Sequence, residues 1–390
     1  MPGRPVRRPA FAMLLALAMA ASSVVAFVLG TLAPFLMDDL GLSRSSFGLL
    51  ATGTIAVAAV LSPLAGYVVD RLGGRPMLVG IFAVTAAGLT AMALAGTYAW
   101  LLAGAAVAGV AAAMGNPTTN QLISQHIPRG LQGTVVGVKQ SGVEAATFLT
   151  GLLLPTVAAA LGWRRAVAVS ALPCVLGLAA TFLVVPTAGA ARAAGPAGTV
   201  PAAAGGPGVA GLAVGGALVG FGESAVAAYT VLYAVEELGT SAAAGGLAVA
   251  LLGLAGIASR IAWSRRIERG TSAAAALVAV ALGGSAAVAL IWVALLVGPW
   301  LLLAGALAFG ATAAAWNAVG NLVLVRSLPA AVAGRMAGVL QGGFYTGLAA
   351  GPLCFGALVD LTGSYAAGWS MVMASLTLAA GLLAVSGRRP

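Results

Sequence analysis

Residues 116–143, NPTTNQLISQHIPRGLQGTVVGVKQSGV, recur at a fixed offset of 201 residues as residues 317–344, NAVGNLVLVRSLPAAVAGRMAGVLQGGF. The two copies agree at asparagine, proline, glycine and glutamine positions: Asn116 and Asn317, Asn120 and Asn321, Pro128 and Pro329, Gly133 and Gly334, Gly137 and Gly338, Gln140 and Gln341, and Gly142 and Gly343. The chain therefore contains an internal duplication. Residues kept in both copies are expected to serve a shared scaffold, and polar residues found in one copy only are candidates for function.

Both copies are apolar almost throughout. The chain is 61% hydrophobic and 7% charged, whereas a soluble domain carries about 25% charged residues. A soluble α-helical protein with buried helices is the alternative, but the chain has too few charges to coat its surface. A membrane-spanning helix needs about 20 residues. We predict an all-α integral membrane protein with twelve transmembrane helices, near residues 10–36, 46–69, 76–96, 98–124, 133–158, 165–186, 208–235, 242–263, 272–296, 299–325, 334–358 and 365–386.

The longest connection divides the twelve spans into two sets of six. Residues 187–207 are rich in alanine, glycine and proline, a composition typical of linkers. We expect an N-terminal six-helix bundle at residues 1–186, a cytoplasmic linker at 187–207 and a C-terminal six-helix bundle at 208–390, with the bundles related by a pseudo-two-fold axis. Duplicated helix bundles are typical of secondary transporters, whose substrate site lies at the repeat interface.

The net charge of +10 does not indicate a nucleic-acid partner, because the cationic residues follow the membrane topology. With a cytoplasmic N-terminus, fifteen arginines lie in inside segments and three, Arg44, Arg164 and Arg165, lie in outside loops. This asymmetry predicts cytoplasmic termini, in a multi-pass protein of the plasma (inner) membrane. A cleaved signal peptide is the alternative for the N-terminus, but the apolar run continues to Met37 and is too long for one.

A charged motif lies at the cytoplasmic end of the second span. Its sequence, Gly66-Tyr-Val-Val-Asp70-Arg71-Leu-Gly73-Gly74-Arg75, resembles the loop motif of the major facilitator superfamily, G-x-x-x-D-R-x-G-R, with Gly74 where the family often has arginine. The span count, the central linker and the repeat extend this resemblance over the whole chain. The alternative is an ordinary positively charged inside loop.

The resemblance implies that Asp70 faces the start of the eleventh span when the cytoplasmic side is closed. A helix N-terminus carries a partial positive charge that favours a carboxylate. The expected cytoplasmic gate therefore comprises Gly66, Asp70, Arg71, Arg75 and Arg335. Alignment of the second half puts Arg260 at the position of Asp70, so gating should be asymmetric.

Lys139 is the only lysine of the chain and lies in the fifth span, where Leu340 is its counterpart in the second copy. A charge at the membrane centre costs about 2.5–3.5 kcal/mol. We expect its ammonium to bind an anion; the alternative is a side chain that reaches cytoplasmic water about 9 Å away. The asparagines of the repeat serve either the scaffold or the substrate. The expected substrate-binding residues are Lys139, Gln140, Asn116, Asn120, Asn317 and Asn321.

Two carboxylates also lie inside spans. Glu144 belongs to the fifth span and Glu223 to the middle of the seventh, and their counterparts are Tyr345 and Val25. Apolar surroundings favour the protonated form of a carboxyl group. Both residues are therefore candidates for proton coupling, and a structural hydrogen bond to a neighbouring helix is the alternative. The resemblance implies that the seventh span lines the central cavity.

These features predict an alternating-access secondary transporter, coupled to protons, of a small organic anion or polar metabolite. The alternative is efflux, by proton antiport, of an amphipathic drug-like compound. Gly347-x-x-x-Gly351-Pro352 resembles the antiporter motif of the superfamily's drug exporters, but it lies in the eleventh span rather than the fifth. A sensor that binds solute and signals to a partner is a third, less favoured class.

The sequence contains no nucleophile–base arrangement, metal-ligand cluster or phosphate-binding loop. We therefore expect no enzymatic activity, no cofactor and no metal. The expected partners are the small-molecule substrate, protons and the lipid bilayer, with no nucleic acid, and the protein is expected to act as a monomer.

Overall fold

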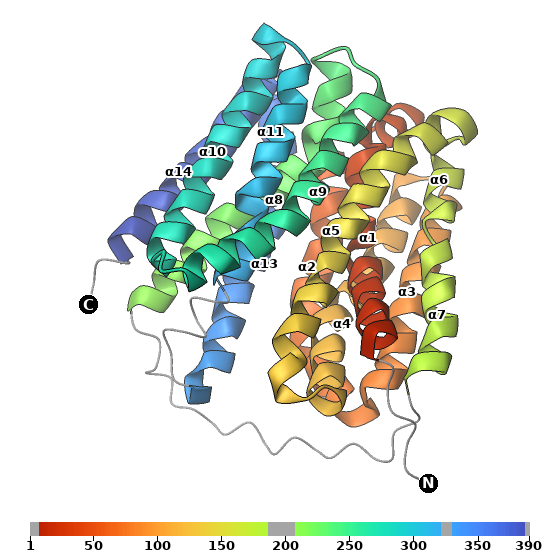
Figure 1. The fold of residues 1–390 in the computed structure, drawn as a ribbon. Helices are drawn as coiled ribbons and strands as arrows, with labels where there is room; N and C mark the ends of the chain where they lie inside the picture. Colours follow the sequence, from red (N-terminus) through yellow and green to blue (C-terminus); the bar gives the residue numbers. More distant parts are fainter. Residues whose placement is uncertain (1–7, 186–206, 321–329, 387–390) are drawn as a thin grey trace. The chain divides into compact units, whose positions relative to one another are not determined.

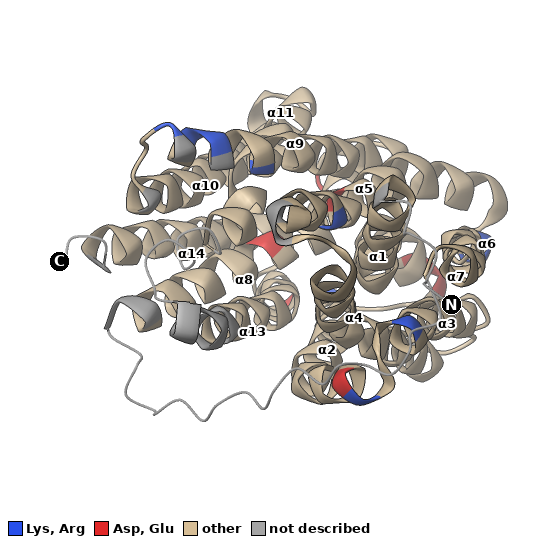
Figure 2. Cartoon of the chain, turned by 60° about the horizontal axis from the view of Figure 1, so that its bottom comes forward, with Lys and Arg blue, Asp and Glu red and all other residues tan. Residues whose placement is uncertain are grey.

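The computed structural model describes residues 8–185, 207–320 and 330–386. The regular elements of these ranges are all helices (Figure 1). Twelve helical segments among the described residues are long and apolar enough to cross a membrane, and charged residues are sparse along them (Figure 2). The prediction of an all-α membrane protein with twelve transmembrane helices is confirmed.

The first copy of the repeat forms six spans, and α6 and α7 together make the sixth. Its helices are α1 (Arg8–Leu40), α2 (Arg44–Leu72), α3 (Gly74–Ala93), α4 (Tyr98–His126), α5 (Arg129–Leu161), α6 (Trp163–Val169) and α7 (Leu172–Val184). The second copy forms the other six. Its helices are α8 (Pro207–Glu236), α9 (Ala242–Glu268), α10 (Ala273–Val297), α11 (Trp300–Ala311), the short 3-10 helix η2 (Ala313–Ala315), α13 (Ala330–Thr362) and α14 (Tyr365–Ser386).

The turns between the first two helices of each copy have the same design. Gly41 and Gly239 adopt φ angles of 61° and 60°, which glycine tolerates because it has no Cβ. Two residues later, Ser43 and Ser241 cap the next helix, each accepting a backbone N–H from three residues on at 3.1 and 3.2 Å. Serine is among the preferred residues at this position because its hydroxyl binds an otherwise unpaired helix N–H. The duplication seen in the sequence thus extends to local backbone structure.

The helices assemble into two compact units. One contains Met1–Leu29 and Gly53–Ala197, and the other contains Gly30–Thr52 and Gly198–Pro390. In the first unit α3 packs on α4, α6 and α7, around a core that includes Phe11, Leu15, Phe82 and Leu122. In the second unit α8 packs on α13 and α14, α10 packs on α11 and α14, and α9 packs on α11.

Residues 30–52 belong to the first copy in the sequence but pack within the second unit. They comprise the end of α1, the connecting turn and the start of α2. The expected linker at 187–207 lies almost entirely outside the described residues, so the division into domains at 1–186 and 208–390 stays a prediction.

Glycines shared by the two copies lie where helices meet closely. A Cβ atom on Gly142 of α5 would collide with the carbonyl oxygen of Ala16 in α1, and one on Gly343 of α13 would collide with that of Ala213 in α8. Small residues allow such close approach in membranes, where packing drives helix association. This pair of glycines serves the scaffold of both copies, as expected from its presence in each.

Candidate functional site

Lys139 of α5 is buried and bound to one face of α4. Its Nζ donates to Asn120 Oδ1 at 2.6 Å, to Thr119 Oγ1 at 2.9 Å and to Asn116 Oδ1 at 3.2 Å. The three partners share a face because they are three and four residues apart on a helix. Only 1% of Lys139 is exposed. The ammonium is therefore held between α4 and α5. The alternative, in which the side chain reaches cytoplasmic water, does not match this arrangement.

The partners of Lys139 are neutral. The two ion pairs found in the described part of the chain both involve Arg44, whereas all three N–H groups of Lys139 bind amide or hydroxyl oxygens. A buried charge without an opposite charge is costly. An anion that approached this ammonium would offset that cost, so the cluster of Lys139, Asn116, Thr119 and Asn120, here the lysine cluster, suits an oxyanion.

The two asparagines keep unused donors beside the lysine. Because Asn116 and Asn120 direct Oδ1 to the ammonium, the Nδ2 group of each amide remains available to donate. Asn120 is exposed and Asn116 is half-buried. Rotation of either amide would exchange an acceptor for a donor next to the ammonium, and all of these donors suit an anionic ligand.

The other expected residues of the fifth and seventh spans have different surroundings. Gln140 is half-buried, and Glu144 is buried with 4% of its surface exposed. Both lie on α5 with Lys139, and their spacing of four residues puts them on one face. Glu223 is half-buried in the middle of α8 and belongs to the second unit. Their role in proton coupling stays a prediction.

The asparagines of the second copy are described only in part. Asn317 is half-buried and follows the buried Trp316, in the second unit. Asn321 lies outside the described residues. The prediction that both asparagine pairs bind substrate therefore stays a prediction.

The motif that resembles the superfamily loop lies at the end of α2 and the start of α3. Asp70 is exposed and accepts a hydrogen bond from Gln121 Nε2 at 3.4 Å, and the same amide donates to the carbonyl of Val69 at 3.0 Å. Gly73 has a φ of 84° at the turn. This arrangement joins the end of α2 to α4.

The arginines of this motif lie on aromatic rings. Arg71 lies 4.4 Å from the ring centre of Tyr67, and Arg75 lies 5.4 Å from that of Phe182. Arg335 belongs to α13, but its side chain is outside the described part. The expected gate between Asp70 and α13 stays a prediction.

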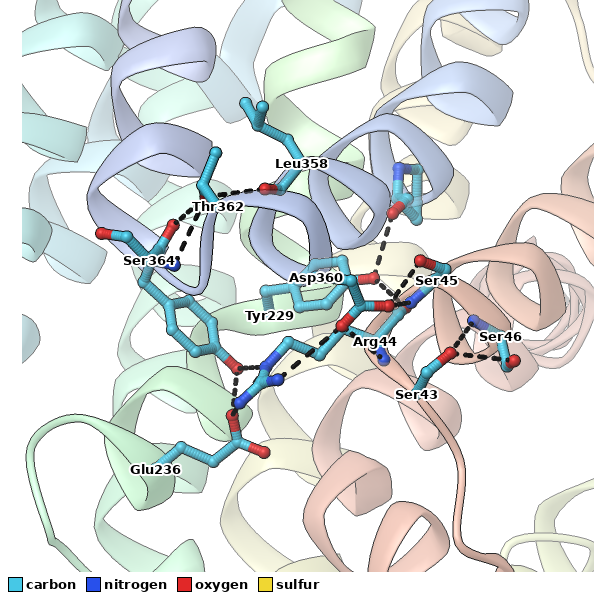
Figure 3. A network of polar contacts seen from close by, with 12 residues as sticks. Ser43, Arg44, Ser45, Ser46, Tyr229, Glu236, Leu358, Asp360, Thr362 and Ser364 are labelled. Carbon is cyan, nitrogen blue, oxygen red and sulfur yellow. Dashed lines mark hydrogen bonds and ion pairs between the residues drawn. The ribbon is translucent and has the colours of Figure 1, made fainter.

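A polar network that the sequence did not predict lies in the second unit (Figure 3). Arg44, the first residue of α2, contacts Glu236 of α8 through Nη2 at 2.6 Å and Asp360 of α13 through Nη1 at 3.7 Å. Its Nε also lies 3.3 Å from the hydroxyl of Tyr365 in α14. Tyr365 in turn donates to Glu236 at 2.7 Å. One guanidinium thus joins α2 to three helices of the second copy.

Asp360 also binds the first backbone N–H groups of α2. Its carboxylate accepts from Ser45 N at 2.7 Å, from Arg44 N at 3.3 Å and from the hydroxyl of Ser45. The first N–H groups of a helix have no partner within the helix, and they carry its partial positive charge. Asp360 is therefore an N-terminal cap for α2, supplied by α13 across 315 residues of sequence.

The sequence did contain a signal for this network. The repeat aligns Arg44 with Ala242 and Asp360 with Ala159, so both charges occur in one copy only. The same asymmetry between the copies distinguishes Lys139 and Glu223, which lie inside the expected spans, whereas Arg44 and Asp360 lie just outside them. Arg44 was assigned to an outside loop, and its contacts depend on how α2, α8 and α13 pack.

Comparison with known proteins finds a family model that matches most of the chain. A family model described as Major Facilitator Superfamily matches residues 15–297. The hexuronate transporter of Bacillus subtilis (strain 168) is 28% identical over 132 residues, which cover 34% of this chain and 31% of that protein. The human solute carrier family 2, facilitated glucose transporter member 10, is 28% identical over 153 residues, which cover 39% of this chain and 28% of that protein.

In both cases the chain matches less than a third of the length of the curated relative. The crystal structure of a D-xylose–proton symporter superposes with a TM-score of 0.77, at 15% sequence identity, over 96% of this chain and 97% of the other. At this identity the similarity concerns the fold alone.

Proposed function

Since the chain belongs to the major facilitator superfamily, we propose that it is an alternating-access secondary transporter of a small organic anion, coupled to protons. The observation that carries this proposal is the lysine cluster. Among the residues that the structure describes, the buried ammonium binds three neutral oxygens and forms no ion pair. An anionic substrate supplies a counter-ion.

The residues of the cluster have distinct roles. Lys139 attracts the anion, and Asn116 and Asn120 orient it by turning an amide so that Nδ2 donates to its oxygens. Gln140, one residue after Lys139 on α5, adds a further polar contact. Asn317 and Asn321 contribute the equivalent polar positions of the second copy.

The names of the related proteins offer two substrate classes to compare, sugar acids and neutral sugars. A hexuronate is a sugar acid, whereas the relative in solute carrier family 2 and the D-xylose–proton symporter are named for neutral sugars. A neutral sugar has no need of a buried ammonium. Lys139 therefore favours an acid over its neutral analogue.

Proton coupling is assigned to the two carboxylates inside spans. Glu144 is buried on the same helix as Lys139, and Glu223 is half-buried on α8. A carboxyl group in apolar surroundings takes up a proton readily, and it can release that proton when the site opens to water. The two residues are the proposed proton carriers.

The membrane setting follows from the arginines. Their excess in alternate connections supports a plasma (inner) membrane location with both termini in the cytoplasm. The same orientation puts Asp70, Arg71, Arg75 and Arg335 at the cytoplasmic end, where they act as the gate. The protein is proposed to act as a monomer.

The test uses a matched pair of ligands, glucuronate and glucose, which differ by the carboxylate. In detergent, a ligand at 100 times its Kd should stabilise the protein by about 2.7 kcal/mol, which thermal unfolding detects. We expect glucuronate to stabilise the wild-type protein and to have no effect on Lys139→Met. Arg165→Met, which removes an exposed positive charge elsewhere, is the control and should respond as the wild type.

A panel of aromatic and short aliphatic carboxylates extends this test to other organic anions. Stabilisation by glucose and glucuronate alike, unchanged in Lys139→Met, would contradict the proposal. Stabilisation by lipophilic cations only would favour the efflux of amphipathic compounds instead.

A further inference from the structure

We propose that Asp360 is the latch that closes the outward-facing end of this protein, by capping the N-terminus of α2. The proposal rests on the alternating-access transport proposed above. It concerns the end of the helices that the arginine distribution assigns to the outside. The latch consists of Asp360, Arg44, Ser45 and Glu236 (Figure 3) together with Tyr365, which binds Glu236 and lies beside Arg44.

The carboxylate of Asp360 is a multiple acceptor. It binds two backbone N–H groups, one hydroxyl and one guanidinium, all from Arg44 and Ser45. Hydrogen bonds to an ionised group are stronger than those between neutral groups. The start of α2 and the end of α13 are therefore joined by charge-assisted bonds over two residues.

The second part of the latch joins the same arginine to α8 and α14. Glu236 binds Arg44 through both Nη2 at 2.6 Å and Nε at 3.0 Å. Tyr365 donates to the carboxylate of Glu236 and lies within hydrogen-bond distance of Arg44 Nε. Arg44 is thus fixed between two acids, and release of α2 requires all of these contacts to break together.

Below the charged groups, α2 lies directly on α13. Tyr229 of α8 is fully buried and donates both to the carbonyl of Arg44 at 2.8 Å and to that of Pro352 at 3.0 Å. A Cβ on Gly48 would collide with the carbonyl oxygen of Pro352, and one on Gly356 would collide with that of Arg44. Thr52 Oγ1 donates to the carbonyl of Ala349 at 2.6 Å. At these positions the backbones of α2 and α13 are in direct contact, so the two helices can separate only if these contacts are lost.

The position of the latch in the chain gives it a role in transport. Residues 30–52 belong to the first copy by sequence, yet they pack within the second unit. If the two copies rock against each other, these contacts have to open for a solute to enter or leave on this side. The equivalents of Arg44 and Asp360 are Ala242 and Ala159, so the repeat does not supply a second latch of this kind.

The latch is the counterpart of the gate expected at the other end. There, Asp70 at the end of α2 is expected to face the start of α13. Here, Asp360 near the end of α13 caps the start of α2. If the expected gate forms, the same two helices would each offer a carboxylate to the N-terminus of the other, one contact at each end.

The test measures access from outside without any substrate. A reporter cysteine replaces Ala349, eleven residues before Asp360 on α13, which is about 16 Å deeper along the helix. Cys174 and Cys354 are replaced by alanine. A membrane-impermeant maleimide is applied to oriented vesicles. We expect Asp360→Asn to raise the labelling rate about tenfold, because one amide oxygen cannot replace the charged acceptor.

Asp38→Asn is the matched control, since it removes an exposed acid at the end of α1, and it should label at the wild-type rate. Asp360→Glu should restore slow labelling in part. Should Asp360→Asn fail to fold, Arg44→Lys keeps the charge while losing the Nε contacts, and it should also raise labelling. Wild-type rates in folded Asp360→Asn and Arg44→Lys would overturn the latch, whatever the result with anionic ligands.

Discussion

At the residue scale, Lys139 and the oxygens that bind it lie 19 to 23 residues apart in the chain, on two helices. Asn116, Thr119 and Asn120 lie in the second half of α4, and Lys139 lies about three helical turns after the start of α5. All three oxygens are neutral. An anion bound beside the ammonium would supply the opposite charge that these three partners do not provide.

Asn120→Asp should abolish anion binding while keeping the shape of the site. A carboxylate in place of Asn120 Oδ1, 2.6 Å from Lys139 Nζ, would neutralise the ammonium with a permanent ion pair. Once the ammonium is neutralised, it no longer attracts the carboxylate of glucuronate. The Kd of glucuronate should therefore rise at least about tenfold, which corresponds to about 1.4 kcal/mol. Gln125→Glu, an equivalent change at an exposed position of α4, should leave the Kd unchanged. Calorimetric titration of both variants measures the effect, and equal Kd values would count against the lysine cluster as the anion site.

At the element scale, the contacts between spans depend on glycines that occur in both copies. Gly142 lies against α1, and Gly343 lies against α8. The rest of the glycine stripe on α13, Gly347 and Gly351, also lies against the backbone of α8. The stripe that resembles an antiporter motif therefore has a packing role in this chain.

Gly343→Ala should lower the midpoint of thermal unfolding, whereas Gly342→Ala should not. Alanine is normally favoured over glycine inside a helix by about 0.5–1 kcal/mol. At Gly343, however, the new Cβ would collide with the backbone of Ala213, while at Gly342 nothing lies within 4 Å. Overpacking costs about 1–3 kcal/mol. Unfolding of the two variants in the same detergent gives the comparison, and equal midpoints would show that the contact between α8 and α13 accommodates the added Cβ without cost.

At the scale of the whole molecule, transport requires each unit to respond to the other. The lysine cluster, which is the proposed anion site, lies in the first unit, and Glu223 and the Arg44 network lie in the second. A proton carried by Glu223 would make the second unit sensitive to pH. Substrate bound at Lys139 would act on the first unit. Transport of substrate and proton would then be coupled if the protein changes conformation only when it carries both or neither.

Glu223→Gln should abolish the pH dependence of uptake. The amide imitates the protonated carboxyl group at every pH, so uptake of the anion in proteoliposomes should no longer rise as the external pH falls. Glu144→Gln is the parallel variant, and it identifies which of the two carboxylates carries the proton. If both variants kept the pH profile of the wild type, neither residue would be the carrier.

The sequence by itself determined the twelve spans, the duplication and the helical fold. Apolar runs of about 20 residues have few stable alternatives in a bilayer, where every backbone group must be paired within the helix. It also identified Lys139, because a charge inside an apolar run is visible without knowledge of the fold.

Only the tertiary structure decided which helix faces which. Periodicity shows that Asn116 and Asn120 share a face of α4, but not that Lys139 of α5 lies against it. The Arg44 network depended on packing still more, since the acids and the tyrosine that bind Arg44 are 192 to 321 residues away from it in sequence. Contacts at such separations are set by the combined packing of many helices, and no local pattern of residues encodes them.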